Sequence, residues 1–154
     1  MTITIIYATE TGNAESLAEE AQERLEGLGH VVAMHDMGDI AVSDLEGVGI
    51  CLGITSTWGE GDPPTEAEPF FEELKGDDAR GWAAMRYSVL GLGDRDYPDF
   101  CQCGKDLDAE LERHGAQRFY PFVECDVDYE EPFAKWLDGV VEALSQMEEP
   151  AAVS

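Results

Sequence analysis

A hydroxyl-rich loop near the start of the chain carries the residue types that bind phosphate. It runs through Thr9, Glu10, Thr11, Gly12, Asn13 and Ala14, between an apolar run at 3–7 and a helical pattern that begins at residue 14 or 15. Threonine hydroxyls, a flexible glycine and the first N–H groups of the helix would converge on one small volume. The positive end of the helix dipole lies behind them. The pattern predicts a site for a dianionic phosphate that needs no lysine.

Two further glycine-rich loops each carry one large aromatic side chain. One loop, 55–64, contains Ser56, Thr57, Trp58, Gly59, Glu60 and Gly61, and the other, 91–100, contains Leu92, Gly93, Asp94, Tyr97 and Phe100, followed by Cys101. Core packing explains a tryptophan on a surface turn poorly. Trp58 and Tyr97 could instead stack on the two faces of a flat ring, each adding about 0.5–1.5 kcal/mol beyond burial. Together the three loops indicate a ligand with a phosphate at one end and a planar ring at the other, a description that FMN fits.

These segments resemble the flavodoxin-like FMN-binding family. They are most similar to stand-alone MioC-type flavodoxins and to the FMN domains of diflavin reductases such as the sulfite reductase flavoprotein. The matching segments are 8–15, 57–63 and 91–94 with Tyr97, and the likeness continues through Phe100, Cys101, Gly104 and Lys105. It covers almost the whole chain. Three separate motifs in the right order make it specific, whereas the glycines of 91–93 alone would be a dinucleotide-binding hint without its third glycine.

The resemblance assigns roles to the loop residues. It implies that residues 9–14 hold the phosphate of FMN, and that 57–61 and 92–97 frame the isoalloxazine ring, with no catalytic residue and no metal site. Trp58 stands where diflavin reductases usually carry tyrosine, which keeps the stacking but removes a hydroxyl. The chain also lacks the nicotinamide-binding domain of those reductases, so we expect it to receive electrons from another protein.

The residues around the expected ring suggest how its redox behaviour is tuned. The acidic side chains Glu60, Asp62, Asp94 and Asp96 oppose a negatively charged reduced flavin, which predicts a low potential. Glycine tolerates positive φ, so the Gly59 peptide could flip and let its carbonyl accept a hydrogen bond from the reduced flavin N5. That flip would favour the neutral one-electron state. The expected function is therefore one-electron transfer from a flavoprotein or ferredoxin-type reductase to an acceptor redox enzyme.

Apolar runs alternate with amphipathic stretches along the chain. Strands are predicted at 2–7, 30–35, 49–54, 87–92 and 118–123, and helices at 13–28, 66–74, 101–113 and 131–147. This order predicts an α/β three-layer sandwich, a five-stranded parallel sheet (order 2-1-3-4-5) with helices on both faces. Ligands of such folds bind beyond the carboxyl ends of the strands, where all three loops lie. We expect one domain over 1–147 and a frayed tail at 148–154.

The composition is strongly acidic, with a net charge of −25 from 34 acidic and 9 basic side chains. Such a charge excludes nucleic acid and anionic membranes as partners and favours docking on basic protein patches. A salt-adapted surface explains the same charge equally well. No apolar run approaches the roughly 20 residues of a spanning helix, and the N-terminus does not resemble a signal peptide. We therefore expect a cytoplasmic monomer.

Four cysteines, Cys51, Cys101, Cys103 and Cys125, form no CxxC pair. Their spacing favours reduced structural thiols over a zinc site or a disulfide framework. The alternative, a redox or cluster site at Cys101 and Cys103, would need further ligands that the neighbouring sequence does not offer.

Other protein classes share this order of strands and helices, but each of them requires particular residues at particular positions. A phosphorylatable receiver domain needs an aspartate at the end of the third strand, where 53–55 read Gly-Ile-Thr. A nucleotide hydrolase needs a glycine-lysine-serine/threonine loop, which the sequence lacks. A flavoenzyme that reduces quinones or nitro compounds directly from NAD(P)H stays open. Aromatic residues on both faces of the ring would leave its substrate little room.

Overall fold

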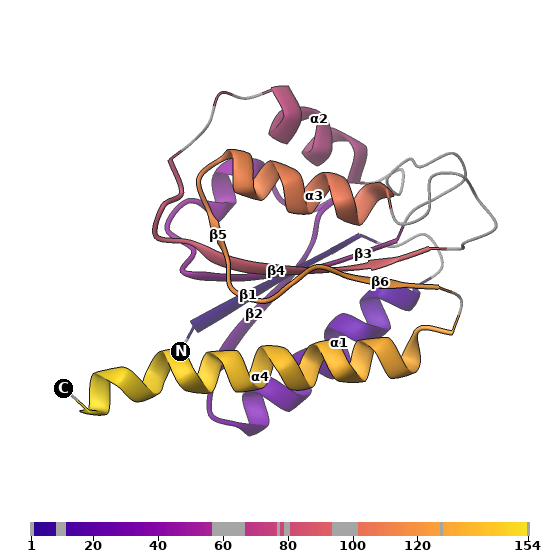
Figure 1. Ribbon diagram of the computed structural model, residues 1–154. Coiled ribbons are helices and arrows are strands. Elements are labelled where there is room, and N and C mark those ends of the chain that lie inside the picture. The colour runs from indigo at the N-terminus through magenta and orange to yellow at the C-terminus, as the bar shows by residue number, and fades with distance from the viewer. Residues whose placement is uncertain are drawn as a thin grey trace.

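The computed structural model describes residues 2–8, 12–56, 67–76, 78, 81–93, 102–126 and 128–153, with side chains described to residue 147. The elements are β1 (Thr2–Ala8), α1 (Asn13–Gly27), β2 (Val31–Asp36), the 3-10 helix η1 (Val42–Leu45), β3 (Ile50–Ser56), α2 (Glu68–Gly76), β4 (Arg86–Leu92), α3 (Gln102–Arg113), β5 (Gln117–Arg118), β6 (Val123–Cys125) and α4 (Glu130–Val153) (Figure 1). The predicted alternation of strands and helices is confirmed. η1 was not predicted, and α4 runs on past the expected end at Met147.

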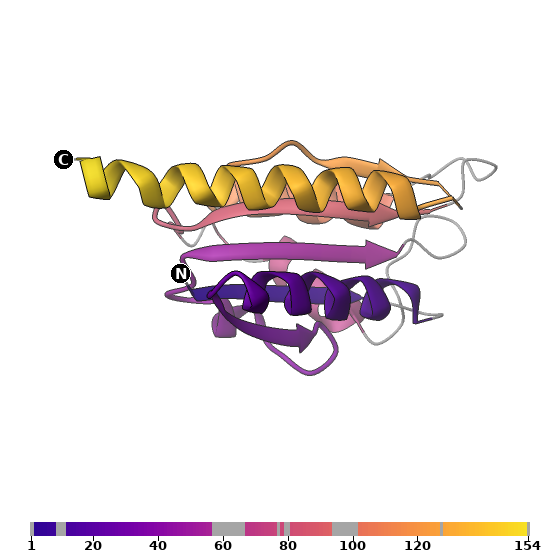
Figure 2. The ribbon, with the colours of Figure 1, turned by 90° about the horizontal axis from the view of Figure 1, so that it is seen from below.

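The strands form one parallel sheet in the order β2-β1-β3-β4-β5, with β6 also paired to β4. This confirms the predicted order 2-1-3-4-5. β1 and β3 are buried on both faces along most of their length, as expected of central parallel strands in a sheet covered on both sides. Figure 2 shows the arrowheads of the strands pointing the same way, behind α1 and α4.

The fifth strand differs from its prediction. A single strand at 118–123 was expected, but the chain pairs with β4 in two short pieces, β5 and β6, separated by residues 119–122. Pro121 lies in this gap. Proline has no N–H to donate and restricts the residue before it, so it interrupts the ladder on an edge strand.

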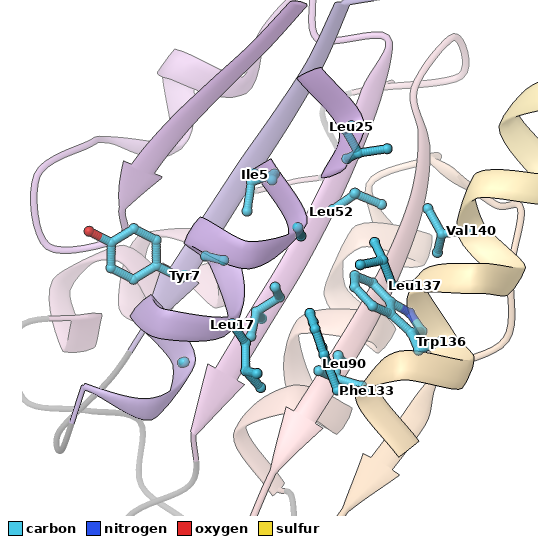
Figure 3. Packing of buried hydrophobic residues seen from close by; sticks show 14 of the residues in the cluster. Ile5, Tyr7, Leu17, Leu25, Leu52, Leu90, Phe133, Trp136, Leu137 and Val140 are labelled. Atoms are coloured by element: carbon cyan, nitrogen blue, oxygen red, sulfur yellow. The ribbon is translucent and has the colours of Figure 1, made fainter. Parts of the chain in front are cut away.

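Two apolar clusters hold the helices on the sheet. On one face, α1 and α4 cover Ile5, Leu52 and Leu90 with side chains that include Leu17, Leu25, Phe133, Trp136, Leu137 and Val140 (Figure 3). On the other face, α2, α3 and η1 cover Ile6, Cys51, Tyr87 and Val89. The buried Trp136 Nε1 within the first cluster donates to Ser88 Oγ at 2.9 Å. The apolar face of α4 is therefore core packing.

α3 lies unusually close to the sheet because glycines face it. A Cβ added to Gly104 of α3 would lie 3.0 Å from Gly91 Cα and from Thr55 Oγ1, and 2.9 Å from the Phe122 ring. A Cβ on Gly53 of β3 would likewise meet Leu107 of α3 at 2.7 Å. The backbone of α3 at Gly104 therefore packs almost directly on the backbone of β4 at Gly91, and the Leu107 side chain packs on the backbone of Gly53.

The close contact predicts that Gly104→Ala destabilises the fold. The methyl group would force α3 away from β4, and such overpacking costs about 1–3 kcal/mol. Gly27→Ala is the matched control, because Gly27 is the last residue of α1 and has nothing within 4 Å of an added Cβ. Urea denaturation should show a lower free energy of unfolding for Gly104→Ala and an unchanged or slightly higher one for Gly27→Ala. Equal values for the two variants would show that α3 is not packed as described.

Candidate cofactor site

The three strands that precede the candidate loops end side by side. β1, β3 and β4 are consecutive neighbours, and their last residues are Ala8, Ser56 and Leu92. Ala8 pairs with Thr55, and Ser56 pairs with Leu92, so the three strands end almost level. The parallel register thus places the loops after these strands at one edge, as predicted from the sequence.

The first turn of α1 faces this edge with backbone donors. Gly12, the residue before the helix, has φ of +90° and no side chain with which to cap the helix. Its carbonyl accepts the first helical bond from Ser16 N at 3.0 Å. The N–H groups of Asn13, Ala14 and Glu15 come before the first residue whose N–H bonds within the helix, so the helix itself offers them no acceptor. A helix start of this kind suits an anion, because its first N–H groups and the helix dipole both attract negative charge.

The neighbouring side chains hold this helix start in place. Ala14 is fully buried against the core, which fixes the direction in which α1 leaves the loop. Ser56 Oγ donates to the carbonyl oxygen of Ala8 at 3.1 Å and ties the ends of β1 and β3 together. In this arrangement the Ser56 hydroxyl gives its one proton to the backbone. It leaves its lone pairs to any further partner.

Carboxylates near this edge act on the buried Tyr7 hydroxyl. The pKa of the Tyr7 hydroxyl is raised above its ordinary value, most of all by burial. The carboxylates of Glu15, Asp36 and Asp39 add to this shift. Each lies close to the carboxyl end of β1 or β2, and together they oppose new negative charge there.

A model of the family described as Flavodoxin matches residues 5–136 of this sequence. The chain belongs to the flavodoxin family. Members of this family bind FMN, and the donor groups described above fit the phosphate of that cofactor.

Curated relatives are similar over nearly the whole chain. The sulfite reductase [NADPH] flavoprotein alpha-component of Bacillus subtilis is 44% identical over 144 residues, which are 94% of this chain and 24% of that protein. The protein of the same name from Neisseria meningitidis serogroup B is 38% identical over 144 residues, again 94% of this chain and 24% of the relative. The chain thus spans about a quarter of the length of these relatives, 24%.

Solved structures with the same fold are stand-alone flavodoxins. A flavodoxin of Streptococcus pneumoniae TIGR4 superposes with a TM-score of 0.82 at 28% identity, covering 96% of this chain and 99% of that one. A short-chain flavodoxin associated with a bacterial microcompartment gives 0.82 at 27% identity, covering 96% and 98%. The resemblance to the flavodoxin-like family and the predicted fold are therefore confirmed.

The structure describes part of the predicted flavodoxin site. Gly12, Asn13, Ala14, Ser56, Leu92 and Gly93 lie together at the carboxyl edge of β1, β3 and β4. The remaining candidates lie outside the described residues and stay predictions: Thr9, Glu10, Thr11, Thr57, Trp58, Gly59, Glu60, Gly61, Asp94, Tyr97, Phe100 and Cys101. The proposed ring stacking by Trp58 and Tyr97 belongs to this second group.

Two residues at this edge escaped prediction from the sequence. Thr55 is fully buried at the end of β3, and within the described part of the chain its Oγ1 has no hydrogen-bond partner. Tyr129, just before α4, donates its hydroxyl proton to Asn13 Oδ1 at 3.4 Å. No motif marks either residue, because each acquires its place through pairing of segments far apart in the sequence.

The described cysteines are structural. Cys51, Cys103 and Cys125 are free and buried. Burial raises the pKa of Cys51 to about 12 and that of Cys125 to about 11, which keeps both thiols protonated at neutral pH. Over the described ranges, no cluster of histidine, cysteine and acidic side chains could hold a metal ion, and no helix is long and apolar enough to cross a membrane. Cys101 lies outside these ranges.

These pKa values predict that the buried thiols are inert in the folded protein. The thiolate is the reactive species, and each unit of raised pKa lowers its fraction about tenfold below the pKa. At pH 8 the reaction of Cys51 and Cys125 with DTNB should be slower in the native protein than in denaturant by at least about a hundredfold. Peptide mapping separates these two residues from Cys101. Rapid labelling of either in the native state would contradict their burial.

Proposed function

We propose that this chain binds FMN noncovalently and passes single electrons at low potential from a reductase to an acceptor redox enzyme. The observation that supports the proposal is the start of α1 directly after Gly12, at the edge where β1, β3 and β4 end together. Membership of the flavodoxin family supports the same cofactor. FMN, when bound, supplies the ability to take up and release electrons one at a time.

Different segments of the chain would bind the two ends of the cofactor. Residues 9–14 would hold the phosphate through N–H groups and hydroxyls. Residues 57–61 and 92–97 would hold the ring, with Trp58 and Tyr97 excluding water from its two faces. Gly59 would offer its carbonyl to the ring nitrogen that gains a proton on reduction. None of these residues breaks a covalent bond, so an electron carrier accounts for them without a substrate pocket.

The partners proposed for this carrier are a flavoprotein or ferredoxin-type reductase as donor and a redox enzyme as acceptor. Six of the basic side chains that the structure describes are paired with carboxylates: Arg24, Lys75, Lys105, Arg113, Arg118 and Lys135. The free charge of the surface is therefore negative, which suits basic patches on both partners. We further propose that the carrier acts as a cytoplasmic monomer.

An anaerobic reductive titration tests the proposed function. The purified chain with FMN should pass through a distinct one-electron form in the visible spectrum before full reduction. Gly59→Ala should lower the maximal amount of that form, since positive φ costs alanine about 1 kcal/mol or more, about a fivefold change in equilibrium. Gly27→Ala serves as the distant control.

Two outcomes of the titration would count against the carrier. A protein that binds no FMN would refute the cofactor assignment. Direct reduction by NAD(P)H in two-electron steps would instead favour an enzyme that reduces quinones or nitro compounds. If Gly59→Ala left the maximal amount of the one-electron form unchanged, the proposed role of Gly59 would be refuted. The proposal of an electron carrier would not be affected.

The acidic surface predicts that electron transfer slows with salt. Attraction between opposite charges speeds encounter, and added ions screen it over about 10 Å at 0.1 M ionic strength. The rate from a basic reductase to this chain should therefore fall as potassium chloride is added. A neutral small-molecule oxidant is the control and should react at a constant rate. A reductase rate that is constant or rises with salt would contradict docking through carboxylates.

A further inference from the structure

A hydrogen bond joins the last part of the chain to the start of α1. The Tyr129 hydroxyl donates to Asn13 Oδ1 at 3.4 Å, across 116 positions of sequence. Asn13 is the first residue of α1, directly after Gly12. The contact therefore lies at the end of the site where the N–H groups of α1 suit a phosphate.

Tyr129 is held firmly enough to orient another side chain. Its ring is half-buried and packs against the core cluster between α1 and α4. Its carbonyl oxygen accepts the bond from Phe133 N at 2.9 Å, so its backbone is part of the first turn of α4. Tyr129 also lines the hollow between the two helices together with Ser16 and Phe133. The hydroxyl thus projects from a fixed ring toward an exposed asparagine.

The chemistry of the asparagine side chain makes this orientation useful. A carboxamide has an accepting oxygen at one end and a donating NH₂ group at the other. If the Asn13 side chain rotated freely, its oxygen could face the phosphate. The negative phosphate and the partial negative charge of the oxygen would then repel each other. A proton donated to Oδ1 by Tyr129 occupies the accepting end and leaves both N–H groups of Nδ2 available. An anion at the start of α1 needs those donors.

We propose that Tyr129 is a positioning residue for the phosphate end of the cofactor site, acting through Asn13. This inference rests on the proposed function, because it takes FMN as the ligand. It makes Tyr129 a determinant of the preference for FMN over riboflavin, which has the same ring and no phosphate. The ring-binding loops are not involved.

The test compares the affinities of the full chain for FMN and for riboflavin, measured by quenching of flavin fluorescence. Tyr129→Phe removes the hydroxyl and keeps the ring in the core. It should weaken FMN binding about threefold to tenfold, the effect of one hydrogen bond, and leave riboflavin binding unchanged. Tyr120→Phe is the matched control, since Tyr120 packs against the same cluster from the segment between β5 and β6. It should change neither affinity.

A double variant shows whether the effect runs through Asn13. Asn13→Ala should also weaken FMN binding selectively, and Tyr129→Phe should then add nothing further, because coupled residues are not additive. Full additivity would overturn the inference, as would unchanged FMN binding in Tyr129→Phe or equal losses for FMN and riboflavin. A wild-type chain that binds no FMN would refute the proposed function itself and the inference with it.

Discussion

The level ending of three parallel strands is the constraint on which the rest of this structure depends. β1, β3 and β4 are paired so that Ala8, Ser56 and Leu92 end at one edge. α1 follows β1 after a short loop, so its first N–H groups must lie at that edge too. A shift of one residue in the register would turn each strand's buried side chains to the other face, and both clusters resist it. The position of the site is therefore fixed by the core.

Charge sets a second constraint, because a chain with net charge −25 must hold an anion. Backbone dipoles solve this problem without lowering the negative charge of the surface. The start of α1 offers N–H groups, while Glu15, Asp36 and Asp39 keep the surrounding field negative enough to act on Tyr7. Donors at the helix start and carboxylates further away can thus stand at the same edge, because the N–H groups act on an anion at short range.

The sequence was informative wherever local pattern determines structure. The β-branched runs and the amphipathic stretches predicted the sheet order and the four long helices, and the glycine-rich loops marked the edge of the site. The sequence could not predict contacts between distant segments, such as the hydrogen bond from Ser56 to Ala8 or that from Tyr129 to Asn13. The divided fifth strand was missed because its apolar pattern outweighed Pro121. The roles of Trp58 and Tyr97 remain predictions from sequence.

α4 links the stability of the fold to the site. The Trp136 bond to Ser88 fixes this helix on the sheet, and the ion pair of Arg24 with Asp138 fixes it on α1. Tyr129 precedes the helix directly, and its hydroxyl lies 3.4 Å from Asn13 Oδ1. The surface ion pair contributes little by itself, whereas the buried hydrogen bond and the apolar stripe contribute most. Packing in the middle of the last helix thus contributes to placing the Tyr129 hydroxyl beside Asn13.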